Sequence, residues 1–180
     1  MMRSRPKVIC CGFHKTATSS LSAALTTLGF KVSEFDERLL VEYSNGDERK
    51  LWRVTRKADA FRDWPWPLVY RAFMERYPDA RAILTVRDTD SWIASLKRHA
   101  AITGPTVARE IVYGHADVAG HEAAIIGRYE THNADVRSYF HGNDALLEFD
   151  AEHGDGWNEL CTFLDLPTPT TPFPHRYRTA

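Results

Sequence analysis

The chain has 180 residues, a formal net charge of −1, and 43% hydrophobic and 26% charged residues. This length is enough for a buried core, and we expect residues 1–180 to form a single domain. The near-zero charge provides no field that would attract nucleic acid, and no apolar run approaches the ~20 residues that span a membrane. The three cysteines, Cys10, Cys11 and Cys161, suit a reducing compartment, so we expect a cytoplasmic protein.

Apolar runs and helical periodicities alternate along the chain. Strands are expected over 7–13, 30–33, 81–87 and 145–149, and residues 59–64 are either a short strand or an ordered loop. Helices are expected over 18–28, 36–45, 47–57, 65–77, 90–100 and 155–164, with a long helical region over 105–141 that is interrupted near Gly114 or Gly120. This alternation predicts a three-layer α/β/α fold with a central parallel sheet, in which ligands bind at the carboxyl ends of the strands.

A polar loop with one lysine joins the first expected strand to the first expected helix. The free N–H groups of a helix's first turn and the helix dipole both favour an anion at that place. Lys15 adds a full positive charge, and hydroxyl donors follow it at Thr16, Thr18, Ser19 and Ser20. The sequence therefore predicts a phosphate-binding loop over residues 12–20.

The order of residues in this loop differs from that of ATP- and GTP-binding P-loops. Those loops place the lysine after a second glycine, whereas Lys15 follows Gly12 alone and precedes the hydroxyl residues. Asp88 is a conceivable magnesium ligand for a kinase, but we expect it to cap the following helix or to pair with Arg87. Both features weaken an ATP-dependent function without excluding it.

Three segments resemble the sulfotransferases that use 3′-phosphoadenosine 5′-phosphosulfate (PAPS). Residues 14–21, His-Lys-Thr-Ala-Thr-Ser-Ser-Leu, resemble the family's 5′-phosphosulfate-binding loop. Arg87 and Ser95 have the spacing of its 3′-phosphate-binding segment, which would bring a guanidinium and a hydroxyl to one phosphate. Residues 145–150 and 173–176 resemble the end of a compact microbial branch of the family.

The resemblance implies a P-loop NTPase-like sulfotransferase fold and a cofactor site. PAPS would be the cofactor, 3′-phosphoadenosine 5′-phosphate (PAP) the product, and no metal would be required. The acceptor would be a hydroxyl or amine of a small molecule or glycan, and Lys15 would stabilise the leaving phosphate. The cofactor-binding residues implied are His14, Lys15, Thr16, Ala17, Thr18, Ser19, Ser20, Arg87, Ser95 and Arg176.

The chain departs from the family pattern in three respects. Ala17 stands where the loop usually has glycine, and an alanine there is strained if the position needs a positive φ. Ser20 stands where cytosolic members have an adenine-stacking tryptophan. Those enzymes are also longer, so an acceptor lid could be missing here, and a homodimer could supply it.

The general base has two candidates. Asp63 lies between aromatic residues, which would raise the pKa of its carboxyl; the alternative is that it caps the helix after Pro65. Glu34, just past the second strand, is the second candidate by analogy with carbohydrate sulfotransferases; its alternative is an exposed charge. His14 lies inside the loop, where it could simply line the site.

Three functions thus stay open at this point. The first is a PAPS-dependent sulfotransferase, which the early lysine and the Arg87–Ser95 spacing favour. The second is a P-loop kinase of a small metabolite that uses ATP and magnesium. The third is a non-catalytic nucleotide-binding module, which Ala17 and the short chain keep open.

Overall fold

The computed structural model describes residues 5–175, and it contains one five-stranded sheet in which every pairing is parallel. The strand order is β2-β3-β1-β4-β5, so β1 is central and its neighbours come from distant parts of the chain. The strands are β1 Val8–Cys10, β2 Val32–Ser33, β3 Ala60–Phe61, β4 Arg81–Thr85 and β5 Leu146–Phe149. The α/β class and the parallel sheet are confirmed.

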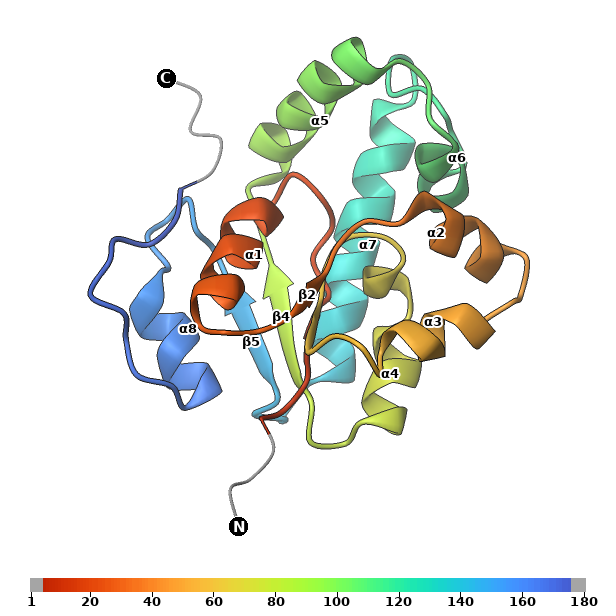
Figure 1. Cartoon of the computed structure of the whole chain (residues 1–180). Coiled ribbons are helices and arrows are strands. Elements are labelled where there is room, and N and C mark those ends of the chain that lie inside the picture. Colours follow the sequence, from red (N-terminus) through yellow and green to blue (C-terminus); the bar gives the residue numbers. More distant parts are fainter. Residues whose placement is uncertain (1–4, 176–180) are drawn as a thin grey trace.

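Helices cover both faces of this sheet (Figure 1). They are α1 Thr18–Thr27, α2 Glu37–Ser44, α3 Arg49–Val54, the 3₁₀ helix η1 Trp66–Leu68, α4 Tyr70–Arg76, α5 Thr89–Thr103, α6 Val107–Tyr113, α7 Glu122–Tyr139 and α8 Trp157–Leu164. The long helical region expected over 105–141 is divided between α6 and α7, and Gly114 and Gly120 both have a positive φ in the connection.

Side chains along β1 alternate between two apolar cores, one on each face of the sheet. Val8 and Cys10 pack with α1 and α8, whereas Ile9 and Cys11 point to the other face and pack with α3, α4 and α7. All four side chains are fully buried. A strand that is buried on both faces has no reason to alternate in polarity, which is why its sequence is a continuous apolar run.

A third apolar cluster lies beyond the carboxyl edge of the sheet. Phe13, just past β1, is fully buried there among residues of α5, α6 and α7, including Trp92 and Tyr129. In Figure 1, α5 and α6 accordingly rise above the strand ends. This cluster supports the residues after β1 and β4, which is where the phosphate-binding segments were expected.

The strands are shorter than the sequence suggested. The expected strand over 7–13 is reduced to β1, because the chain turns into the loop after Cys11, and the expected strand over 81–87 ends at Thr85. Residues 59–64, left open between strand and loop, contain both, since β3 is followed by a turn at Asp63. Within residues 5–175, no helix is both long and apolar enough to cross a membrane.

Candidate active site

The loop between β1 and α1 is held against β4 by a close backbone approach. A Cβ atom added at Gly12 would lie 2.7 Å from the Thr85 backbone nitrogen, so only glycine fits. Next to it, the Cys11 N–H donates to the Ile83 carbonyl at 2.7 Å. The loop therefore starts from a fixed point at the carboxyl edge of the sheet.

Two loop residues adopt left-handed backbone conformations. The φ angles are 66° at Lys15 and 63° at Ala17, so Ala17 does have the positive φ that favours glycine. Ala17 stands at the N-cap of α1 and has no side-chain oxygen with which to cap the helix. Residues in left-handed conformations are typical of backbone nests that bind anions, and they persist where surrounding structure enforces them.

The loop hydroxyls do not all face the same way. Thr16 is 1% exposed. Its Oγ1 donates to the Phe13 carbonyl and forms a second hydrogen bond with Thr85 Oγ1 at 2.6 Å. Its side chain thus braces the loop, and a ligand would meet only its backbone. Thr18 and Ser20 are also buried, whereas Ser19 is partly exposed at the first turn of α1.

Hydrogen bonds and burial hold the His14 side chain in an uncharged form beside the loop. Its Nε2 lies 2.9 Å from the Tyr113 hydroxyl, and its carbonyl accepts a hydrogen bond from Trp92 Nε1. Burial, helped by the positive charge of Lys15, lowers the pKa of the imidazole to about 3. His14 is therefore neutral near pH 7 and contributes shape rather than charge.

Several positive charges gather around this loop. Burial and the nearby guanidinium of Arg87 lower the pKa of Lys15, and Arg98 on α5 lowers it further. Asp63 raises the pKa of Lys15 and Glu152 pairs with Arg87, so carboxylates offset part of this positive charge. The arrangement fits a ligand with phosphate or sulfate groups.

Ser95 lies on α5, and within residues 5–175 its side chain forms no hydrogen bond with Arg87 or with the loop. It is partly buried, two turns into the helix, and shares a face with Arg98 and His99, which follow at helical spacing. Arg98 and His99 are close enough to Lys15 for the charges to shift pKa values: Lys15 helps lower that of His99. Arg98 was not identified from the sequence, although its i+3 spacing from Ser95 was a usable signal.

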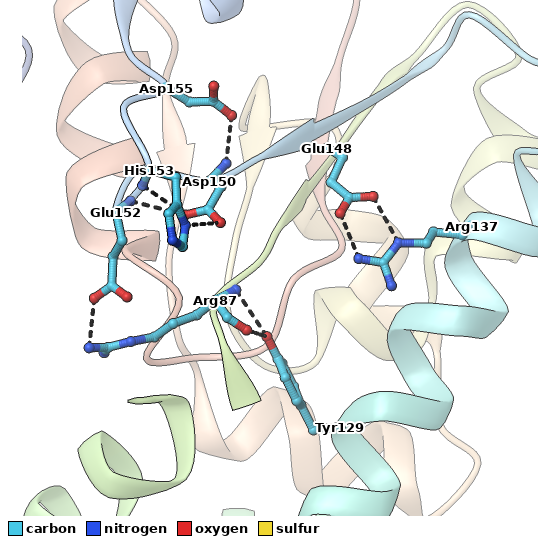
Figure 2. Close-up of polar contacts among 8 residues, drawn as sticks. All are labelled: Arg87, Tyr129, Arg137, Glu148, Asp150, Glu152, His153 and Asp155. Atoms are coloured by element: carbon cyan, nitrogen blue, oxygen red, sulfur yellow. Dashed lines mark hydrogen bonds and ion pairs between the residues drawn. The ribbon is translucent and has the colours of Figure 1, made fainter. Parts of the chain in front are cut away.

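Arg87 follows β4, and hydrogen bonds to its backbone hold it in place. The Tyr129 hydroxyl accepts a hydrogen bond from the Arg87 N–H at 3.1 Å and donates to its carbonyl at 3.0 Å (Figure 2). One turn further along α7, His132 Nε2 bonds to the Cys11 carbonyl at 2.7 Å. One helix therefore holds the ends of both strands that lead into the site.

The Arg87 guanidinium has an unused donor. Its NH1 group donates to the Lys15 carbonyl at 3.3 Å, and NH2 pairs with Glu152 at 2.6 Å. Its Nε is buried and has no hydrogen-bond partner within residues 5–175. A buried N–H without an acceptor is costly, and a phosphate oxygen would satisfy it.

The two base candidates are connected through Arg62. Glu34 Oε1 lies 2.8 Å from an Arg62 nitrogen and accepts a hydrogen bond from Ser22, and the other end of the guanidinium lies 3.4 Å from Asp63 Oδ2. The Glu34 side chain is 56% exposed, that of Asp63 only 16%. Arg62 was missed in the sequence, although it adjoins Asp63.

Asp63 is placed by a left-handed turn. Its φ is 63°, and its Oδ1 accepts a hydrogen bond from the Trp64 N–H at 2.9 Å. Its side chain does not cap the helix after Pro65, because that helix is η1 and no side-chain hydrogen bond caps it. Burial raises the pKa of its carboxyl, while Arg62 and Lys15 act in the opposite direction, so the carboxyl is close enough to Lys15 to be influenced by it.

The aromatic residues that follow Asp63 belong to apolar clusters. Trp66 and Tyr70 are core residues on the α4 side of the sheet, and Trp64 packs edge-on against Phe13 at 4.7 Å. Asp88 caps α5 by accepting a hydrogen bond from the Ser91 N–H, as expected. Arg176, the last cofactor-binding candidate, lies outside the described residues. No group of three or more metal-ligating side chains occurs among residues 5–175.

Comparison with known proteins identifies the class of protein to which this fold belongs. A family model described as a sulfotransferase domain matches residues 7–113 and 102–180, so the chain belongs to the sulfotransferase domain family. It is also similar to Ava biosynthesis cluster protein M of Aspergillus versicolor. The two are 26% identical over an alignment that covers 94% of this chain and 80% of that protein.

Proposed function

We propose that the protein is a PAPS-dependent sulfotransferase acting on a hydroxyl or amine of a small molecule or glycan. The observation that carries the proposal is the group of cations at the carboxyl edge: Lys15, Arg87 and Arg98, with the unsatisfied Nε of Arg87 among them. Within the sulfotransferase family, a nucleotide with phosphate groups at both ends is the ligand whose charges match this edge.

The chain's own residues divide into two binding positions. The first turn of α1, Ser19 and the Lys15 ammonium would hold the 5′ end, and Arg87 with Ser95 would hold the 3′-phosphate. PAPS, when bound, supplies the sulfuryl group and leaves as PAP. Lys15 would stabilise the negative charge that develops on the departing phosphate, because it belongs to the loop that would hold the 5′ end.

Asp63 is our first candidate for the proton acceptor. It is more buried than Glu34 and lies near enough to Lys15 for the two charges to interact. A raised pKa makes a carboxylate a stronger base, which suits removal of a proton from an acceptor hydroxyl or amine. Glu34 bonds to Ser22 and Arg62, an arrangement that suits a role in holding Arg62 in position.

Calorimetric titration of the purified protein with PAP, beside ATP with magnesium, tests the cofactor. We expect micromolar or tighter binding of PAP without metal, and weak binding of ATP, because the first turn of α1 and Arg87 would each hold one phosphate of PAP. Binding of ATP–magnesium without PAP would indicate a kinase. A folded sample that binds neither nucleotide would contradict a PAPS site and favour a non-catalytic module.

Arg87→Ala tests the 3′ position specifically. We expect PAP binding to weaken about a hundredfold, by analogy with the loss of a strong charge-assisted contact, and adenosine 5′-phosphate binding to change little. The two ligands differ only in the 3′-phosphate, so the ratio of their dissociation constants is the measurement. Equal weakening of both would place Arg87 away from the 3′ group.

A further inference from the structure

The guanidinium of Arg87 is engaged by a carboxylate from a distant loop. Glu152 Oε1 lies 2.6 Å from its NH2 group, and Figure 2 shows the two side chains meeting head-on at the carboxyl edge of the sheet. The Arg87 side chain is 19% exposed and that of Glu152 is 40% exposed. This ion pair was not foreseen from the sequence, since the two residues are far apart along the chain.

The loop after β5 is folded so that it presents Glu152 to Arg87. Asp150 Oδ1 accepts hydrogen bonds from the N–H groups of Glu152 and His153 at 3.1 and 3.2 Å. Asp155 Oδ2 accepts one from the Asp150 N–H at 2.7 Å, which closes the turn from the other side (Figure 2). The backbone of Glu152 is therefore held by the loop itself and does not depend on the ion pair.

The carboxylate satisfies Arg87 only in part. Glu152 contacts NH2 alone, and the neighbouring Nε keeps no partner among the described residues. A guanidinium binds a phosphate through two parallel N–H bonds, and one phosphate group has enough oxygens to accept from both Nε and NH2. A 3′-phosphate would thus complete an arrangement that the carboxylate leaves incomplete.

We propose that Glu152 is a specificity-determining residue that competes with the nucleotide's 3′-phosphate for Arg87. This inference rests on the proposed function, because it takes the 3′-phosphate of PAP as the rival anion. Nucleotides without a 3′-phosphate would leave the Arg87–Glu152 ion pair in place, so Glu152 would not affect their affinity. For PAP, the returning carboxylate lowers affinity and assists release, a step that limits turnover in many enzymes.

Glu152→Gln removes the competing charge and keeps the size of the side chain. We expect PAP to bind about fivefold more tightly and to dissociate correspondingly more slowly, while the affinity for adenosine 5′-phosphate stays within about twofold. Calorimetry gives the affinities, and stopped-flow displacement of PAP gives the dissociation rate. Thermal melting verifies that the exposed substitution leaves the protein folded.

Glu148→Gln is the matched control. Glu148 is 44% exposed, lies on β5 close to Glu152 in the sequence, and pairs with Arg137 at 2.6 Å, so the variant loses the same charge and a similar ion pair elsewhere. It should bind PAP as the unmodified protein does. Tighter PAP binding by both variants would show a general charge effect and overturn the inference.

The remaining outcomes separate the inference from the proposed function. If the unmodified protein binds PAP and Glu152→Gln binds it equally or more weakly, the competition is absent while the cofactor site stands. Equal tightening of adenosine 5′-phosphate would likewise overturn it, because that ligand has no 3′-phosphate. If neither protein binds PAP, the proposed function itself fails, and the inference fails with it.

Discussion

Replacing Lys15 with alanine is expected to slow sulfuryl transfer at least about a hundredfold and to leave PAP binding largely intact. The loss of one preorganised charge that stabilises a leaving group costs about 3 kcal/mol in the transition state. Arg87 and the first turn of α1 remain to hold PAP in the variant. The measurements are PAP release from PAPS, with the best acceptor found in a library of alcohols, phenols and amines, and PAP calorimetry.

Lys97→Ala is the appropriate control for that experiment. Lys97 is an exposed lysine of α5 that pairs with Glu122 at 2.9 Å, so the substitution removes a lysine without touching the loop. Alanine at position 15 retains a Cβ in the same left-handed conformation as lysine, so the backbone strain is unchanged. A Lys15→Ala variant with undiminished turnover would remove this residue from the mechanism.

Asp63→Asn is expected to lower the transfer rate by about a hundredfold to ten-thousandfold, the range that general base catalysis contributes. Asparagine is the right replacement because it tolerates a left-handed backbone at least as well as aspartate, and the φ of 63° can be kept. Measured rates with saturating PAPS should therefore report the loss of the carboxylate and not of the turn.

The pH dependence of the transfer rate tests the same assignment of Asp63 as the base. A base acts when it is deprotonated, so the rate should rise with pH through the pKa of Asp63, which burial has raised above the ordinary value of 3.8. The rising limb should disappear in Asp63→Asn. Glu34→Gln is the comparison, with an expected loss of less than about tenfold. A larger loss in Glu34→Gln than in Asp63→Asn would assign the base to Glu34.

Local patterns in the sequence were sufficient for much of the fold. The two-sided burial of β1 and β4 explains their continuous apolar runs, and Asp88 before α5 is a normal helix cap. The positive φ at Ala17 was foreseen as a condition that the loop could impose. The strand ends were not, because they depend on where the loops turn into the third apolar cluster.

Apart from Arg98, whose i+3 spacing from Ser95 was a usable signal, the parts of the site that the sequence did not reveal depend on tertiary contacts. Arg62 shows its importance only when β2 and β3 place Glu34 and Asp63 on either side of it. Tyr129 reaches Arg87 across 42 residues, and Glu152 reaches it from beyond β5. Such contacts have no periodicity or spacing rule, so a single sequence contains no signal for them.

The hydrogen bonds from α7 have a consequence for how a nucleotide is selected. Tyr129 holds Arg87 after β4 and His132 holds Cys11 after β1, so a single turn of α7 sets the gap between the two segments that we propose bind phosphate. The hydrogen bonds that set this gap lie within the protein, so binding would spend little conformational entropy on forming it. If the chain binds PAPS as proposed, α7 sets the distance between the two ends of the cofactor, and a displacement of α7 would move both anchor points together without changing that distance.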